Sequence, residues 1–146
     1  MTEINDFLNQ NICKYLVDYF QNNIDRSQVY NKRFKILLDK INDDNVILNV
    51  VKLYKNLRPQ QILKNIELIK CPKGESMDWH KDTPFYDVTS ITYLNQGYEG
   101  GLTYIEDYCV NSQTGKIILF DSSKKHKVTE LKEGSRFVLI AWYKNG

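Results

Sequence analysis

The stretch VTSITYLNQGYEGGLTYI, residues 88–105, decides the fold class of this chain. Its two ends, residues 88–94 and 102–105, are rich in β-branched and aromatic residues, which favour strands. Turn signals lie between them at Asn95-Gln96-Gly97 and Gly100-Gly101. The stretch therefore predicts two short strands separated by turns.

The same pattern continues on both sides of this stretch. Downstream, β-rich runs cover residues 116–120, 127–131 and 136–143, and turn signals such as Thr114-Gly115 and Glu133-Gly134 separate them. Upstream, residues 62–69 end in a two-residue alternation, and Cys71-Pro72-Lys73-Gly74 reads as a turn. Several short strands at this spacing favour a β-sandwich or barrel, and a jelly roll is one option.

The first third of the chain is predicted to be helical. One amphipathic stripe recurs at three- and four-residue steps, with Asn5 or Asp6 as its cap and Asn22-Asn23 as its end: Phe7, Leu8, Ile12, Leu16, Tyr19 and Phe20. A second helix is expected over residues 43–56, with Val46, Val50, Leu53 and Leu57 on one face. Residues 35–38 between the helices could form a short strand. Helices followed by strands predict an α+β fold with the helices packed on one sheet.

Composition limits the classes of protein to consider. A length of 146 residues with 42% hydrophobic residues predicts one globular domain over residues 1–146. A formal charge of +2 gives no strong nucleic-acid signal, and no apolar run is long enough to span a membrane. The three cysteines form no C-x-x-C pair, and no signal peptide is evident, so a cytoplasmic location is expected.

The only two histidines, His80 and His126, are candidate metal ligands together with Asp82. Residues two apart on a strand point to the same side, so His80 and Asp82 can present an imidazole and a carboxylate to one point. A second histidine from a distant strand completes a two-histidine, one-carboxylate face with open positions, as non-haem iron(II) oxygenases use. Taken singly, a His-x-Asp is common, and His126 among lysines also fits a solvated loop.

Arg136 is the candidate anion-binding residue. It lies ten residues beyond His126 (136 − 126 = 10) and opens the apolar run Phe137-Val138-Leu139-Ile140-Ala141-Trp142. A cation at the start of a buried strand is costly unless an anion pairs with it. The distal carboxylate of a dicarboxylate suits a guanidinium, although an arginine at an exposed strand end is the simpler alternative.

The pieces from Ile66 to Tyr143 together resemble the 2-oxoglutarate/iron(II) oxygenases, and within them the prolyl-hydroxylase-like branch. The matching pieces, in order, are Pro72-Lys73-Gly74, His80-Lys81-Asp82, Thr89-Ser90-Ile91-Thr92-Tyr93-Leu94-Asn95, Glu99-Gly100-Gly101-Leu102-Thr103, Leu119-Phe120-Asp121, His126-Lys127-Val128, and Gly134-Ser135-Arg136-Phe137 running to Trp142-Tyr143. Their order and spacing form a more specific signal than the triad alone.

The resemblance implies a double-stranded β-helix, which is a jelly roll, with the site at its open end. It implies that His80, Asp82 and His126 hold iron(II), and that Arg136 and Tyr93 bind the distal carboxylate of 2-oxoglutarate. Val128 and Trp142 fall where the pocket wall is expected. It further implies hydroxylation of a C–H bond with O2, release of succinate and CO2, and ascorbate as an optional cofactor.

The substrate is less well supported than the cofactors. The branch implies a prolyl residue of a peptide or protein, with loops 83–87 and 96–99 and their Tyr86 and Tyr98 as contact surface. However, Cys71 and the pair Tyr86-Asp87 depart from the tyrosine and the arginine that oxygen-sensing members carry near these positions. Hydroxylation of a free amino acid, another small molecule or a nucleobase stays an alternative, although Trp142 replaces the second arginine of nucleic-acid demethylases. A non-catalytic, metal-binding jelly roll is the alternative from another class.

Overall fold

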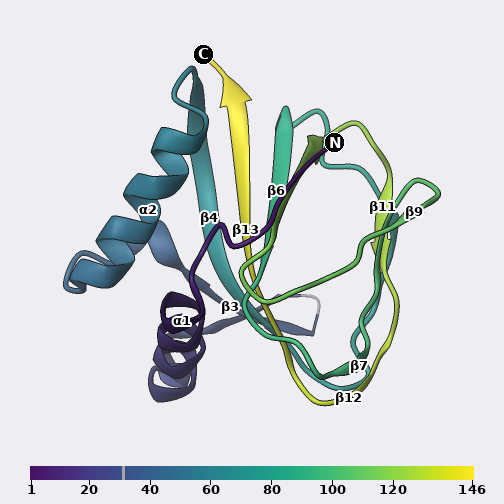
Figure 1. Ribbon diagram of the computed structural model, residues 1–146, viewed down its shortest axis with the longest axis horizontal. Coiled ribbons are helices and arrows are strands. Elements are labelled where there is room, and N and C mark those ends of the chain that lie inside the picture. Colours follow the sequence, from purple (N-terminus) through teal and green to yellow (C-terminus); the bar gives the residue numbers. More distant parts are fainter. Residues whose placement is uncertain (31) are drawn as a thin grey trace.

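The computed structural model describes residues 1–30 and 32–146. Two antiparallel sheets face each other, and two helices cover the outer face of the larger sheet (Figure 1). The fold is therefore an α+β jelly roll with N-terminal helices on one sheet, which confirms the predicted fold class. None of the helices in the described part of the chain is long and apolar enough to cross a membrane.

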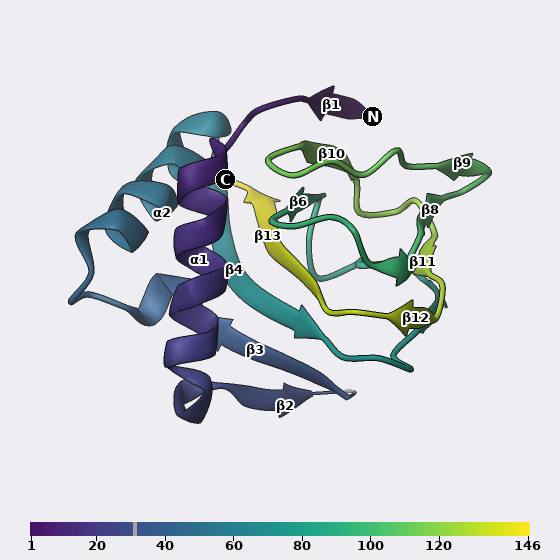
Figure 2. The same cartoon turned by 60° about the horizontal axis from the view of Figure 1, so that its bottom comes forward.

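The larger sheet has seven strands. Their spatial order is β1 (Thr2–Ile4), β10 (Ile117–Asp121), β6 (Val88–Tyr93), β13 (Arg136–Asn145), β4 (Gln61–Cys71), β3 (Arg33–Leu37) and β2 (Gln28–Tyr30). The smaller sheet contains β5 (Met77–His80), β11 (His126–Val128), β8 (Thr103–Ile105) and β9 (Tyr108–Cys109). A third pair joins β12 (Leu131–Glu133) to β7 (Glu99–Gly100) at one end. Figure 2 shows β2 and β3 at one side of the larger sheet, away from β1 and β10.

Both faces of the larger sheet are buried, and strand β13 shows why. Its side chains alternate, so that Phe137, Leu139, Ala141 and Tyr143 pack in the core under the helices. The residues between them, Val138 and Ile140, pack in the core between the two sheets. Because β13 lies in the middle of the sheet, it links the helical core to the cavity that faces the smaller sheet.

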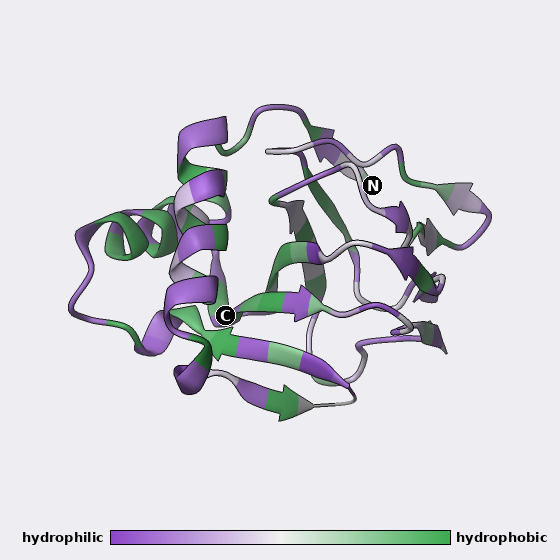
Figure 3. Ribbon diagram, turned by 90° about the horizontal axis from the view of Figure 1, so that it is seen from below, coloured by the Kyte–Doolittle hydropathy of each residue, from purple (hydrophilic) through white to green (hydrophobic). Residues whose placement is uncertain are grey.

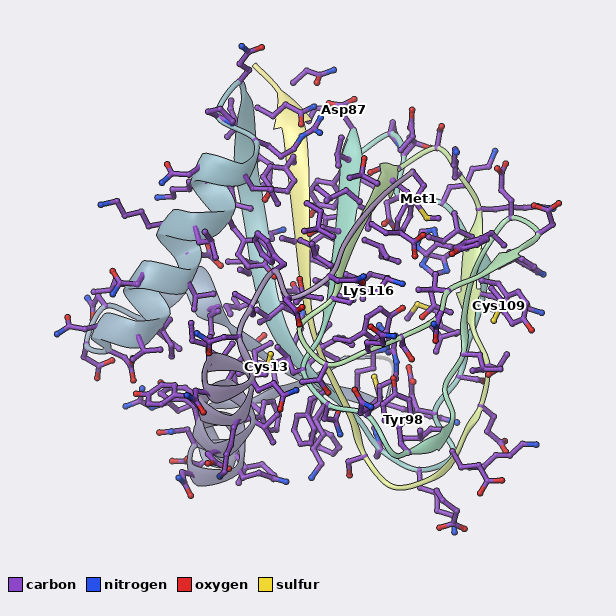
Figure 4. All side chains as sticks on the ribbon, viewed as in Figure 1. Met1, Cys13, Asp87, Tyr98, Cys109 and Lys116 are labelled. Atoms are coloured by element: carbon purple, nitrogen blue, oxygen red, sulfur yellow. The ribbon has the colours of Figure 1, made fainter. Side chains whose placement is uncertain are left out.

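The helices α1 (Gln10–Asn22) and α2 (Asn45–Leu57) are amphipathic, as predicted, and short 3-10 turns follow α1 at Ile24–Arg26 and β3 at Leu38–Lys40. Their apolar sides face the sheet, and hydrophilic residues gather on the outer side of α1 (Figure 3). Cys13 of α1 lies at this interface (Figure 4). The helices thus pack on the outer face of the larger sheet, and its inner face is left to the smaller sheet and the cavity.

The predicted cap of the first helix was wrong. Asp6 has a φ of 53° and lies outside the helix, which begins only after Asn9. The Asn9 side chain accepts a hydrogen bond from the Ile12 backbone N–H, so Asn9 is the cap. The expected end at Asn22-Asn23 is confirmed.

The predicted buried face of the second helix was partly wrong. Leu53 is exposed, and the buried residues of α2 are Ile47, Val50, Val51 and Tyr54. The Tyr54 hydroxyl shares a buried hydrogen bond with Thr92 of β6, and Tyr143 of β13 donates to the Tyr54 carbonyl. These hydrogen bonds hold the face of α2 that carries Tyr54 against the sheet, and Leu53 therefore faces outward.

Candidate active site

The two histidines lie opposite each other on neighbouring strands. His80 ends β5, His126 begins β11, and the two residues are register partners in the smaller sheet. Their ring centroids are 4.1 Å apart. His126 is buried, with its ring edge-on to Phe120, so it is not the solvated loop histidine that its lysine neighbours suggested. Pairing of distant strands therefore brings both imidazoles to one point on the inner face.

Asp82 completes the group. One of its carboxylate oxygens lies 3.8 Å from His80 Nε2 and the other 3.5 Å from His126 Nε2. One potential ligand atom from each of the three residues lies within 4.8 Å of the other two. Asp82 Oδ2 also accepts hydrogen bonds from Thr89 Oγ1 at 2.7 Å and from Trp142 Nε1 at 3.1 Å. These two donors orient the carboxylate.

The reason given for the closeness of His80 and Asp82 was wrong, although the two side chains do meet. Strand β5 ends at His80, so Asp82 does not share a strand face with it. The Asp82 backbone N–H donates to the Ser122 carbonyl, and the Asp82 carbonyl accepts from Tyr86 N–H. The chain turns away from the ladder at this point, and contacts to the β10 end and to β6 aim the carboxylate inward.

In both histidines the hydrogen bond engages Nδ1, so that Nε2 is the ring nitrogen available to a metal. His80 Nδ1 lies 2.8 Å from the Asp78 carbonyl, and His126 Nδ1 lies 3.0 Å from the Lys124 carbonyl. A carbonyl can only accept, so Nδ1 carries a proton in both rings, and in the neutral form of each ring Nε2 keeps its lone pair. Burial lowers the pKa of His126 below its ordinary value, which favours the neutral, metal-binding form of that ring.

Arg136 is fully buried at the start of β13. Its Nη2 donates to Thr103 Oγ1 at 3.1 Å, and its Nη1 lies 3.5 Å from Cys71 Sγ. Its Nε has no hydrogen-bond partner, and no carboxylate of the described residues pairs with this guanidinium. A buried cation without an anion is costly, so the position is suited to an anionic ligand.

Tyr93 and Gly101 surround this guanidinium. The Tyr93 hydroxyl donates to Thr103 Oγ1 at 2.8 Å, and the guanidinium carbon lies 5.6 Å from the centre of the Tyr93 ring. Burial raises the pKa of Tyr93, so its hydroxyl stays a neutral donor. A Cβ at Gly101 would come within 3.1 Å of Arg136 Cδ, so a larger residue would crowd the arginine. Arg136, Tyr93 and Thr103 thus form a compact polar group.

A cavity of about 670 Å³ connects this group, through Arg136, with the triad, whereas Tyr93 and Thr103 are not among its lining residues. Val128 and Trp142 line it, at the positions expected for the pocket wall. Apolar Ile69, Ile91 and Ile140 form much of the inner surface. Its other side is charged and polar, with Arg33, Lys35, Asn65, Glu67 and Asp78. The volume and lining are those of a small-molecule site.

Several site residues escaped prediction from the sequence. Thr89 and Thr103 bond the Asp82 carboxylate and Arg136, yet both stood in the sequence only as strand residues. Arg33 comes from β3, far from the matching pieces, so its sequence neighbours gave no signal. Only the strand order brings it to the cavity.

The two loop tyrosines, Tyr86 and Tyr98, have different surroundings. Tyr86 lines the cavity, stacks on Trp142 with ring centroids 5.3 Å apart, and accepts from Asn65 through its hydroxyl. Tyr98 packs against the core between the sheets, and its hydroxyl is buried (Figure 4). Tyr98 does not line the cavity, and its ring lies beside Gly101 and its Cβ beside Gly134, so its expected contact with a substrate stays a prediction.

Comparison with curated proteins finds PKHD-type hydroxylases. One from Synechococcus sp. (strain CC9605) is 32% identical over 81 residues, which are 47% of this chain and 36% of that protein. One from Prochlorococcus marinus (strain NATL1A) is 26% identical over 77% of this chain and 55% of its own length. The chain therefore spans about half or less of the length of these relatives. No family model matches it.

Solved structures with the same fold include prolyl hydroxylases. The viral collagen prolyl hydroxylase of Paramecium Bursaria Chlorella virus-1, in complex with 2-oxoglutarate, matches with a TM-score of 0.75 and 15% identity, over 99% of this chain and 95% of that one. A Trichoplax adhaerens prolyl hydroxylase bound to a peptide fragment matches with a TM-score of 0.79 and 16% identity, over 99% and 83%. The chain is thus similar in sequence to PKHD-type hydroxylases and in fold to prolyl hydroxylases, in line with the resemblance stated from the sequence.

Proposed function

We propose that this protein is an iron(II)- and 2-oxoglutarate-dependent dioxygenase that hydroxylates a C–H bond and releases succinate and CO2. The observation that carries the proposal is the convergence of His80, Asp82 and His126 beside a buried arginine without an anionic partner. The curated hydroxylase relatives support the same activity.

The three side chains fit a metal of the iron(II) type. Two neutral imidazole nitrogens and one carboxylate, with room beside them in the cavity, match the donor set that such enzymes use. The Asp78 and Lys124 carbonyls and the Thr89 and Trp142 donors hold the ligands from behind. Outer partners of this kind fix the orientation of ligands and so raise metal affinity.

The buried polar group fits 2-oxoglutarate. Arg136 would bind the distal carboxylate, and the hydroxyls of Tyr93 and Thr103 lie beside the guanidinium to share it. The cavity connects this group with the triad, so the other end of the same molecule could reach the metal. A five-carbon dicarboxylate is therefore the co-substrate that the charges and the connection support.

Iron(II) with bound 2-oxoglutarate supplies, on reaction with O2, the oxidising power for C–H hydroxylation. The residues of this chain would bind the metal and the co-substrate, orient them and shield the reacting groups from water. Asp82 is held by Thr89 and Trp142, while Arg136 neutralises one end of the co-substrate. Ile91, Val128 and Ile140 keep the wall apolar and limit the access of water to the reacting groups.

For the substrate, the first choice is a prolyl residue in a peptide or protein, in line with the peptide-bound neighbour from Trichoplax adhaerens. Tyr86, stacked on Trp142 at the cavity, would contact the substrate ring. A free amino acid is the second candidate, because charged residues line one side of the cavity.

The test is an anaerobic titration of the purified protein with iron(II) and then 2-oxoglutarate, followed by visible absorption. A metal-to-ligand charge-transfer band is expected in the wild type and should be absent from the His126→Ala variant. Succinate formed after O2 is admitted then separates an enzyme from a non-catalytic metal-binding jelly roll. Folded protein that gives no band would contradict the proposal.

A further inference from the structure

We propose that Arg33 binds a carboxylate of the substrate inside the cavity, separately from the carboxylate that Arg136 binds. The inference rests on the proposed function, because it assigns a substrate class to the same site. It concerns a residue on β3, outside the pieces from Ile66 to Tyr143 that carry the resemblance in sequence. The argument depends on how Arg33 is held, which of its donors stay available, and where it lies relative to the triad.

Arg33 is buried and held from one side. Its side chain is 8% exposed, and its Nε donates to Glu75 Oε1. Glu75 is itself fixed, because its backbone N–H donates to the Pro72 carbonyl and its carbonyl accepts from Leu131 N–H. The turn after β4 therefore places a carboxylate behind the guanidinium and sets its direction.

Glu75 binds only one of the nitrogen atoms of the Arg33 guanidinium. Glu75 Oε2 makes no hydrogen bond, so the pair is joined only through Nε and Oε1 rather than by a two-pronged contact. A guanidinium has further N–H donors on its two Nη atoms, and no described residue accepts from them. The two Nη atoms are absent from the group of fully buried polar atoms that lack a partner, and Arg33 lines the cavity. Donors of a buried arginine thus remain available to a ligand.

The strand order places Arg33 near the reacting centre but apart from Arg136. Phe34 pairs with Lys70, and Cys71 pairs with Arg136, so Arg33 lies one strand beyond Cys71. Two strand spacings put the backbones of the two arginines roughly 10 Å apart. Arg33 also lines the same cavity as His80, Asp82 and His126. A carboxylate held by Arg33 would thus lie close to the metal ligands.

The wall beside Arg33 is charged as well. Lys35 and Glu67 form an ion pair at 3.3 Å, and both line the same cavity. The side chain of Glu67 is only 11% exposed, so little water reaches this wall. Charges kept at a desolvated ligand wall disfavour an uncharged apolar substrate and suit one with ionic groups. The carboxylate could be the α-carboxylate of a free amino acid or an acidic side chain of a peptide.

The competing explanation is that Arg33 and Glu75 only brace the fold. Four variants separate the two roles. Arg33→Gln removes the charged guanidinium, and the double variant Arg33→Gln/Glu75→Gln removes both charges, so that no buried charge is left unpaired. Glu75→Gln keeps the guanidinium. Arg26→Gln removes an exposed arginine that does not line the cavity, as a control for net charge. Thermal melts establish that each variant is folded.

The experiment measures binding rather than turnover. The protein is loaded anaerobically with iron(II) and saturating 2-oxoglutarate, and calorimetry follows two matched pairs of probes. The first pair is L-proline and L-prolinamide. The second pair is the blocked dipeptides acetyl-Pro-Glu-amide and acetyl-Pro-Gln-amide. Calorimetry is repeated without metal, so that the preference is measured even if no charge-transfer band forms and the proposed function fails.

In at least one pair, the acid should bind the wild type on the order of tenfold more tightly than the amide. The preference should disappear in Arg33→Gln and in the double variant, and persist in Glu75→Gln and Arg26→Gln. A preference in the first pair identifies a free α-carboxylate, and one in the second an acidic side chain. The proposal is overturned if the wild type prefers neither acid, or if the preference survives in the double variant.

Discussion

At the scale of single residues, the site depends on hydrogen bonds that leave one reactive atom available. Each imidazole is anchored through Nδ1 to a backbone carbonyl and presents Nε2. Asp82 is anchored through Thr89 and Trp142, and Arg136 through Thr103. Such anchors prepare the residues before any ligand arrives, so little further ordering is needed on binding.

Arg136→Ala should weaken 2-oxoglutarate binding by on the order of tenfold to a hundredfold, the usual worth of a charged hydrogen bond. Iron(II) affinity should stay close to that of the wild type, because Arg136 contacts none of the three candidate ligands in the described structure. Equilibrium titration of the charge-transfer band measures the first, and iron(II) binding without 2-oxoglutarate measures the second. Unchanged 2-oxoglutarate affinity would remove Arg136 from the proposed site.

The pH dependence of stability should carry the signature of His126. Burial lowers its pKa in the folded protein, whereas the unfolded chain takes up the proton near pH 6.5. Below about pH 6.5 the unfolded state therefore binds more protons, and the free energy of unfolding of the metal-free protein falls as the pH falls. Urea unfolding between about pH 7 and pH 5 should give a shallower slope for His126→Gln. Parallel slopes would speak against a depressed pKa.

At the scale of the element, local signals decide where helices begin and which strand side chains share a face. The alternation along β13 sends Arg136, Val138, Ile140 and Trp142 to the cavity side and the intervening residues to the helical core. A shift of one residue would exchange the two sets, so the register of β13 against β4 and β6 is essential to the site.

Asn9→Ala should reduce the free energy of unfolding by about 1 kcal/mol, because the Ile12 N–H loses its capping acceptor. Asp6→Ala is the matched control, since Asp6 lies before the helix and caps nothing there. Chemical denaturation of both variants measures the difference. If Asp6→Ala proved the more damaging change, Asn9 would not be the cap of α1.

At the scale of the whole molecule, one sheet serves two cores. The helices stabilise its outer face, and the cavity and the smaller sheet occupy its inner face. This division lets the outer core supply stability while the inner face carries charged groups such as Arg33, Glu67 and Arg136. Stability and binding should therefore respond separately to substitutions on the two faces.

Leu139→Ala tests this separation. Leu139 is fully buried on the helical side of β13, and loss of a buried leucine side chain should destabilise the fold by about 2–5 kcal/mol. Iron(II) and 2-oxoglutarate affinities, measured at a temperature where the variant is folded, should match those of the wild type. A comparable loss of 2-oxoglutarate affinity would show that the two faces are coupled through β13.

The sequence by itself determined the fold class and most strand positions, because alternation and turn residues act over a few neighbouring positions. It also singled out His80, Asp82, His126 and Arg136 as candidates, since these residue types stood out in their local surroundings. Strand β1, the split of the expected run at 127–131 into β11 and β12, and the start of α1 were not predicted. Strand β1 and the split into β11 and β12 depend on partners that are distant in the chain, whereas the start of α1 depends on the local bond between Asn9 and Ile12.

Only the tertiary structure decided how the candidates meet. The direction of Asp82 comes from Ser122, Thr89 and Trp142, none of which is its sequence neighbour. The place of Arg33 in the cavity comes from the pairing of β3 with β4. Hydrogen bonds between distant strands have no local pattern in the sequence, because either partner could satisfy its polar groups in many other ways until the sheet order brings the two together.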